Sequence, residues 1–185
     1  MKPIKGYNAA QASGDFERLA AGGYVIRING VENNEDKQYL KIVYDIAEGP
    51  ERGRYKEIDP KDNNANWRCS FVRSYKESAL GMFKAFIKAV DESNETNFND
   101  FIEKGFDEQH LKGCRLGVLF GYEEYEANDG NVKERLRLVR FLTIEQVRAG
   151  DFRIPELKKL AGSDIKPTSA PPAGFTPLND ADAPF

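Results

Sequence analysis

The sequence predicts a mainly β fold in which five strands enclose a core and one helix is inserted between the third and the fourth. Two observations carry this prediction. Apolar and polar residues alternate in five short runs, as they do in strands that bury one face. Between the third and fourth runs, apolar residues instead recur at spacings of three and four, which indicates an amphipathic helix. The 185 residues are enough for one domain and an extension.

The first three strands are expected in close succession, at residues 24–29, 39–46 and 54–58. In the second of them the even-numbered positions are apolar and are assigned to the core. Polar links at residues 32–36 and 48–53 are rich in Asn, Glu, Gly and Pro, which are typical of turns. Two strand-to-strand turns in a row predict an antiparallel meander.

The helix is expected next, and the polar run at residues 91–94 should end it. A fourth strand is predicted at residues 115–122 and a fifth at residues 132–142. The Asp-Gly pair within residues 127–131 is a strong hairpin signal between these two strands. The apolar residues that define the helix are Leu80, Phe83, Phe86, Ile87 and Val90.

Residues 67–75 allow two interpretations. Trp67, Phe71 and Tyr75 are spaced about four apart, which fits the buried stripe of a helix. Alternatively, some of these rings are platforms on which nucleic-acid bases stack, with Arg68 and Arg73 beside them. Helix and strand therefore both remain open for this segment.

Composition argues against several classes of protein. Cys69 and Cys114 have neither the number nor the spacing of a disulfide framework or a zinc site, so buried free thiols are expected. No apolar run reaches the length of a membrane span and the N-terminus lacks a signal-peptide core, which predicts a cytoplasmic protein without a membrane partner. The formal net charge of −3 argues against a generally basic nucleic-acid binder. That argument weakens when charge is considered locally.

The sequence nominates no catalytic site. His110 is the only histidine and has no partner nearby in sequence, and Gly-rich phosphate-binding loops are absent. Glu123, Glu124 and Asp129 could hold magnesium in a nuclease, but alternate side chains of a strand diverge, which favours a solvated hairpin tip. We therefore expect a protein that is not an enzyme and needs no cofactor or metal.

Three strands, a helix and two strands follow the order of the OB-fold, a five-stranded Greek-key barrel. OB-folds bind oligonucleotides across the second and third strands and with the loops that join strands one to two and four to five. Cations in these regions would contact phosphates and aromatic rings would stack on bases, although an ordinary solvated barrel face shows the same alternation. The candidate residues for single-stranded DNA are Lys37, Tyr39, Lys41, Arg52, Arg54, Tyr55, Lys56, Trp67, Arg68, Lys133, Arg135 and Arg137.

The end of the chain adds a resemblance to a known family. Residues 166–174 have the Pro- and Ala-rich composition of a disordered linker, and the chain ends in an acidic tip closing on Pro-Phe. A barrel with such a tail resembles the bacterial and phage single-stranded DNA-binding proteins, and residues 22–27 and 44–54 look like the opening of small phage members. The predicted organisation is a lead-in at residues 1–21, the OB-fold domain at residues 22–160 and the flexible tail at residues 161–185.

The resemblance implies a protein that coats single strands without strong sequence preference during phage DNA replication, recombination and repair. It also implies that the tip docks replication and recombination proteins, through Asp180, Asp182, Pro184 and Phe185. The alanines between these acids depart from the more acidic tips common in the family. The alternative is an adaptor of the replication machinery whose barrel binds another protein, and a homo-oligomer stays open in either case.

Overall fold

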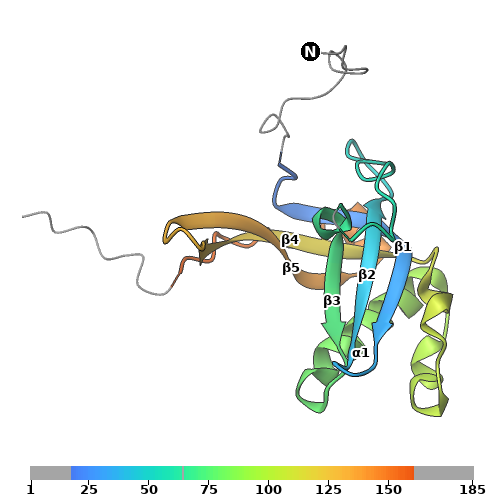
Figure 1. The fold of residues 1–185 in the computed structure, drawn as a ribbon. Helices are drawn as coiled ribbons and strands as arrows, with labels where there is room; N and C mark the ends of the chain where they lie inside the picture. Colours follow the sequence, from blue (N-terminus) through green and yellow to red (C-terminus); the bar gives the residue numbers. More distant parts are fainter. Residues whose placement is uncertain (1–17, 64, 161–185) are drawn as a thin grey trace, which may run out of the picture.

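The structure is a computed structural model that describes residues 18–63 and 65–160, and its fold is mainly β (Figure 1). Five antiparallel strands form one open sheet in the order β3-β2-β1-β4-β5. The longest helix lies between the third and fourth strands, where the sequence predicts it. The strands are β1 (Gly22–Asn34), β2 (Tyr39–Ile46), β3 (Ser70–Ser74), β4 (Arg115–Glu126) and β5 (Val132–Leu142).

The described helices are short apart from α1 (Leu80–Asn94), whose buried residues include Phe83, Phe86 and Val90 of the predicted apolar stripe. A second helix, α2 (Ile144–Ala149), follows β5 and was not expected from the sequence. None of the helices in the described part of the chain is long and apolar enough to cross a membrane. The 3₁₀ turns are Asn66–Cys69, Glu77–Ala79, Phe98–Asp100, Ile102–Lys104 and Glu108–Leu111.

Strand β1 is the central strand of the sheet and links its two halves. From Gly22 to Arg27 it pairs with β4, and from Ile26 to Asn34 it pairs with β2. The β1–β2 register shifts between Ile28 and Gly30, and such bulges increase local twist. The fourth strand thus returns beside the first, while the second and third lie on the other side of it.

The third strand predicted at residues 54–58 is wrong. These residues form turns, and the strand that pairs with β2 is Ser70–Ser74. The Asp45 side chain accepts a hydrogen bond from the Tyr55 backbone N–H at 2.8 Å and another from the Ile46 N–H. These bonds hold the turns against the end of β2, so residues 54–58 are not available as a ladder strand. The helical interpretation of residues 67–75 is also wrong, since a single 3₁₀ turn leads into β3.

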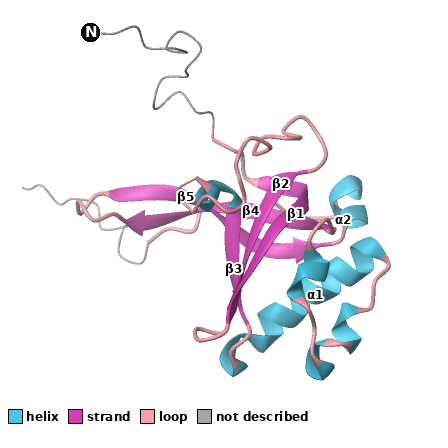
Figure 2. Ribbon diagram, turned by 45° about the vertical axis from the view of Figure 1, so that its right-hand side comes forward, coloured by secondary structure: helices cyan, strands magenta, loops and turns pink. Residues whose placement is uncertain are grey.

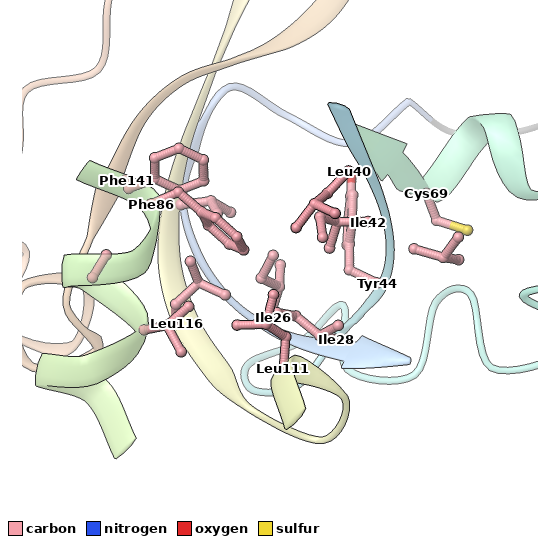
Figure 3. Close-up of a cluster of buried hydrophobic side chains, with 14 of the residues drawn as sticks. Ile26, Ile28, Leu40, Ile42, Tyr44, Cys69, Phe86, Leu111, Leu116 and Phe141 are labelled. Atoms are coloured by element: carbon pink, nitrogen blue, oxygen red, sulfur yellow. The ribbon is translucent and has the colours of Figure 1, made fainter. Parts of the chain in front are cut away.

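The core lies between the inner face of the sheet and α1 (Figure 3). Ile26, Ile42 and Leu116 are fully buried there, from three different strands. The ring of Phe86 on α1 meets Phe141 of β5 at a centroid distance of 5.2 Å. These contacts follow from the alternation in the strands and the three-and-four spacing in the helix.

The two edge strands meet through side chains. Phe71 of β3 and Phe141 of β5 have ring centroids 5.8 Å apart, while no ladder of backbone hydrogen bonds joins β3 to β5 in the described residues. The sheet is therefore open, and the closed barrel expected from the sequence is not confirmed. We call this contact between β3 and β5 the seam.

The outer face of β2 is partly covered, which the alternation of its sequence does not indicate. Val43 and Asp45 are buried although they alternate with Ile42 and Tyr44 and so lie on the other face of the strand, where Val43 extends the apolar cluster toward Cys69. Cys69 lies on the opposite side of β2 from Leu40 and Ile42 (Figure 3), so the loop between β2 and β3 folds over this face. Neither Cys69 nor the half-buried Cys114 forms a disulfide.

The residues after β5 cover the outer face of β1 and β4. A Cβ on Gly23 would lie 2.5 Å from the ring of Phe152, and one on Gly121 would lie 2.5 Å from Cγ of Pro155. Lys158 then forms a parallel bridge with Glu123 of β4. The free edge of β4 beyond its pairing with β1 is therefore occupied by the chain's own residues 155–160.

Candidate nucleic-acid interface

Part of the predicted site lies on the outer face of β2 and β3, near the β1–β2 turn. Tyr39 and Lys41 are half-buried there, and Lys41 pairs with Val72 of β3 in the ladder. The Lys41 ammonium donates to Asn63 Oδ1 at 2.5 Å, and Glu32 of β1 pairs with Lys41 on its other side. Because strand side chains alternate, Tyr39, Lys41 and Val72 face the same way. We name these three residues the β2–β3 face.

Trp67 lies in the 3₁₀ turn before β3 and is 66% exposed, the largest exposed fraction among the large apolar side chains of the described residues. The guanidinium carbon of Arg68 is 5.5 Å from the centroid of the indole ring, a cation–π geometry. Val72, further along the same segment, is 50% exposed. An exposed flat ring beside a cation is the arrangement on which unpaired bases stack.

The β1–β2 turn brings one further cation close to this face. Lys37 is exposed, and its backbone N–H donates to Asn34 Oδ1 at 2.9 Å, which stabilises the turn. The side-chain amide of Asn34 is 3.5 Å from the Tyr39 hydroxyl. Lys37 and Tyr39 are therefore held at the same end of the sheet.

The predicted residues between 52 and 56 do not form a strand surface. Arg54 forms an ion pair with Glu51, and Tyr55 packs edge-on against Tyr44 with ring centroids 6.0 Å apart. Burial raises the pKa of the Tyr55 hydroxyl, as expected for a ring that leans into the core. Arg52 and Lys56 are exposed in the same turns. Tyr55 is thus a packing residue in this structure, and its ring face is not presented to solvent as that of Trp67 is.

The distal parts of β4 and β5 project from the body as a hairpin, on the side where β3 lies (Figures 1 and 2). We name residues 121–137 the hairpin arm. Its outer side carries Lys133, Arg135 and Arg137, because Arg135 pairs with Glu123 and Arg137 with Gly121 in the ladder. The three predicted cations of the fifth strand therefore do share one face of the arm.

Each cation of the arm has an acidic neighbour. Glu123 accepts from Arg135 Nε at 2.9 Å and from Arg137 Nη1 at 2.5 Å, and Lys133 Nζ is 2.7 Å from Asp129 Oδ2. Glu123 is only 8% exposed, which differs from the solvated hairpin tip expected for it. The hydrogen bond from Arg137, followed by that from Arg135, lowers the pKa of the Glu123 carboxyl below its usual range.

The arrangement brings together two groups of the predicted residues and separates a third. The β2–β3 face with Lys37 forms one group and the cations of the hairpin arm form the other, while Trp67 lies beyond Ser70, at the other end of β2 from Lys37. The turns that carry Arg52 and Arg54 lie at the opposite end of β2 from Lys37. The docking residues Asp180, Asp182, Pro184 and Phe185 lie outside the described residues, as does most of the predicted lead-in.

Two residues of the site do not follow from the sequence patterns. The sequence suggests Glu123 only as a metal ligand or as part of a solvated hairpin tip, whereas it forms ion pairs with two arginines of the arm. Arg73 was noted as a neighbour of aromatic rings but not as a site residue, and it lies at the seam over Phe71 and Phe141. Arg73 is two residues after Phe71 and therefore on the same side of β3, a signal that depends on residues 70–74 being a strand.

No group of three or more His, Cys, Asp or Glu side chains in the described residues is arranged to hold a metal ion. No protein-family model matches the chain, and no curated protein matches it significantly. The resemblance to single-stranded DNA-binding proteins therefore stays a prediction.

Proposed function

We propose that this chain is an OB-fold protein that coats single-stranded DNA without strong sequence preference and acts in phage DNA replication, recombination and repair. The strand order supports the OB-fold part of the proposal. The run β4-β1-β2-β3 is the order of a Greek key, and α1 connects β3 to β4. An OB-fold is a partly open barrel, and the Phe71–Phe141 contact between the two edge strands is compatible with this arrangement.

The observation that carries the proposed function is Trp67, a 66% exposed indole at the end of the β2–β3 face. Burial of this ring against a base would remove apolar surface from water, and stacking is worth about 1–3 kcal/mol per base. In a duplex both faces of each base are already stacked, so this ring has no surface to contact there. The geometry therefore favours single strands over duplex.

The distribution of charge is compatible with this role. Three of the 30 acids but only one of the 27 bases lie after residue 160. The remaining body is nearly neutral, and its hairpin arm gathers Lys133, Arg135 and Arg137 on one face. Phosphates that approach this face compete with Glu123 and Asp129 for the cations, which predicts strong sensitivity to salt.

Fluorescence anisotropy of labelled oligo(dT), titrated with protein over a salt series, tests the proposal. We expect binding that weakens with a log–log slope of about −0.7 per phosphate contact. Unlabelled duplex of the same length should compete poorly. Absence of binding at low salt would overturn the proposal. The alternative function, an adaptor that binds another protein, would then remain.

Trp67→Ala is the matched test of the site itself. We expect oligo(dT) affinity to fall by about 5-fold to about 150-fold, which corresponds to the loss of one stacked base at about 1–3 kcal/mol. Thermal stability should stay close to that of the wild type, because the exposed ring contributes little to the core. The control is Phe101→Ala, which removes another exposed ring, 5.9 Å from the Lys104 ammonium, from the region after α1. Equal effects of the two substitutions would contradict the assigned site.

A further inference from the structure

Arg73 occupies the seam between the two edge strands. It pairs with Leu40 in the ladder and shares the inner side of β3 with Phe71. Its guanidinium carbon is 5.0 Å from the ring centroid of Phe71 and 4.6 Å from that of Phe141. The cation is therefore held by the rings of β3 and β5, at the place where the described sheet has no backbone ladder.

The hydrogen bonds of Arg73 are incomplete. Nη1 donates to the Val72 carbonyl at 2.8 Å, but Nε and Nη2 are buried and have no partner within the described residues. Burial, followed by the nearby positive charge of Arg137, lowers the pKa of the Arg73 guanidinium to about 10. A buried cation whose donors are unsatisfied is costly. Either a ligand accepts hydrogen bonds from these donors in the functional state, or the side chain is kept for its packing.

The two unsatisfied donors point to the chemistry of the ligand. Nε–H and the adjacent N–H of Nη2 are parallel, and together they form the edge of the guanidinium that binds two oxygens of one phosphate or carboxylate. Arg137 of the hairpin arm is a second cation whose charge acts on Arg73. Its Nη1 is bound to Glu123 on the outer side of the hairpin arm, which leaves further N–H groups of Arg137 for another acceptor.

We propose that Arg73 binds one backbone phosphate of single-stranded DNA at the seam. The proposal rests on the proposed function and adds a site to it, because a strand that runs from the β2–β3 face to the hairpin arm crosses the seam. In the free protein both donors are buried, so β3 and β5 must separate slightly or the guanidinium must turn outward. No backbone hydrogen bond between these strands opposes that movement in the described residues.

The competing explanation is that Arg73 only braces the seam through its contacts with Phe71 and Phe141. The two explanations differ for Arg73→Met, which keeps an unbranched apolar side chain over the rings and removes the charge and the unsatisfied donors. A phosphate-binding Arg73 predicts weaker DNA binding without a loss of thermal stability. A brace predicts lower thermal stability with unchanged DNA binding.

The experiment compares four proteins by oligo(dT) anisotropy over a salt series and by thermal unfolding: wild type, Arg73→Met, Arg73→Lys and Lys88→Met. The last removes the same charge from the exposed face of α1, where Lys88 faces Glu92. We expect Arg73→Met to bind about tenfold more weakly at low salt, with a log–log slope about 0.7 less steep. Arg73→Lys should keep the wild-type slope and lose about threefold in affinity, because a lysine does not bind two oxygens with parallel donors.

The outcomes separate this proposal from the proposed function. If the wild type binds oligo(dT) and Arg73→Met binds like Lys88→Met with the same slope, the phosphate site is overturned while the proposed function stands. If the wild type does not bind, the proposed function itself fails. If Arg73→Met does not fold, Arg73→Lys still decides, because unchanged affinity in that variant rules out recognition by the paired donors.

Discussion

A single carboxylate pairs with two of the three cations that the hairpin arm can offer to a ligand. Glu123 lies between Arg135 and Arg137 and is nearly buried by them. A phosphate that binds these arginines must first compete with Glu123. Under the proposed function, the residue stabilises the free arm and opposes DNA binding, so arm stability and DNA affinity should change in opposite directions when it is replaced.

Glu123→Gln tests whether stability and DNA affinity change in opposite directions. We expect oligo(dT) affinity at low salt to rise by about three- to tenfold, because two arginines lose their acidic partner. The free energy of unfolding should fall by about 1–2 kcal/mol with the loss of charge-assisted hydrogen bonds. Anisotropy and urea unfolding measure the two effects. Glu126→Gln removes a charge from the exposed end of the same strand, and an equal rise in affinity there would show that net charge alone is responsible.

The lowered pKa of Glu123 also predicts how stability depends on pH. Because hydrogen bonds from Arg137 and Arg135 lower the folded-state pKa, the stabilisation is fully present above the ordinary pKa of a glutamate, about 4.3, and is lost as pH falls through the lowered pKa. The difference in unfolding free energy between wild type and Glu123→Gln should stay constant from about pH 8 to about pH 5 and shrink below that. Urea unfolding at a series of pH values checks this. A difference that persists unchanged at the acid end would contradict the ion-pair assignment.

At the scale of elements, β4 is the strand on which the other parts depend. It pairs with β1 near its start, with β5 along nearly all its length and with the residues around Lys158 near its end. The Glu124 N–H donates to the Lys158 carbonyl at 2.9 Å, and the Lys158 N–H donates to the Tyr122 carbonyl at 3.0 Å. The base of the hairpin arm is therefore supported on both edges, which leaves its tip as the projecting part.

Gly121→Ala should disrupt the contact between β4 and residues 155–160. The new Cβ would lie 2.5 Å from Pro155 Cγ and 3.1 Å from Val139 Cγ2, so residues 155–160 must move away from β4. We expect a loss of about 1–3 kcal/mol in unfolding free energy and faster hydrogen exchange at the Glu124 amide. Gly81→Ala is the control, because nothing lies near a Cβ at that position on α1, and it should be neutral or slightly stabilising. Unchanged exchange at Glu124 in Gly121→Ala would show that the segment does not depend on this close approach.

At the scale of the whole molecule, the proposed function links the folded body to the C-terminal tip. Deletion of residues 180–185 should leave thermal stability unchanged and strengthen oligo(dT) binding by about two- to fivefold at low salt, because the tip's acids compete with DNA for the arm's cations. The gain should vanish at high salt. Asp180→Asn with Asp182→Asn should reproduce it, and Phe185→Ala should not, since the ring is assigned to docking of protein partners. Unchanged affinity at low salt after the deletion would contradict the competition between the acidic tip and DNA.

Local patterns predicted several elements well. The helix expected around Leu80–Val90 is α1, and the predicted fifth strand has the bounds of β5. The hairpin between β4 and β5 follows from its Asp-Gly turn. These elements are long or have a strong turn signal beside them, so neighbouring residues suffice to identify them. Of the candidate site, the shared face of Lys133, Arg135 and Arg137 follows from the same alternation.

The sequence by itself determined the mainly β class, the position of α1 and the cationic side of the hairpin arm, because each depends on residues a few positions apart. Only the tertiary structure decided that β3 is Ser70–Ser74, since a five-residue alternation is shared by the turns at residues 54–58 and only pairing with β2 distinguishes them. It also decided the environments of Glu123 and Arg73. Their partners come from other strands, and the free energy of a buried charge depends on those partners and on burial, which no local pattern contains.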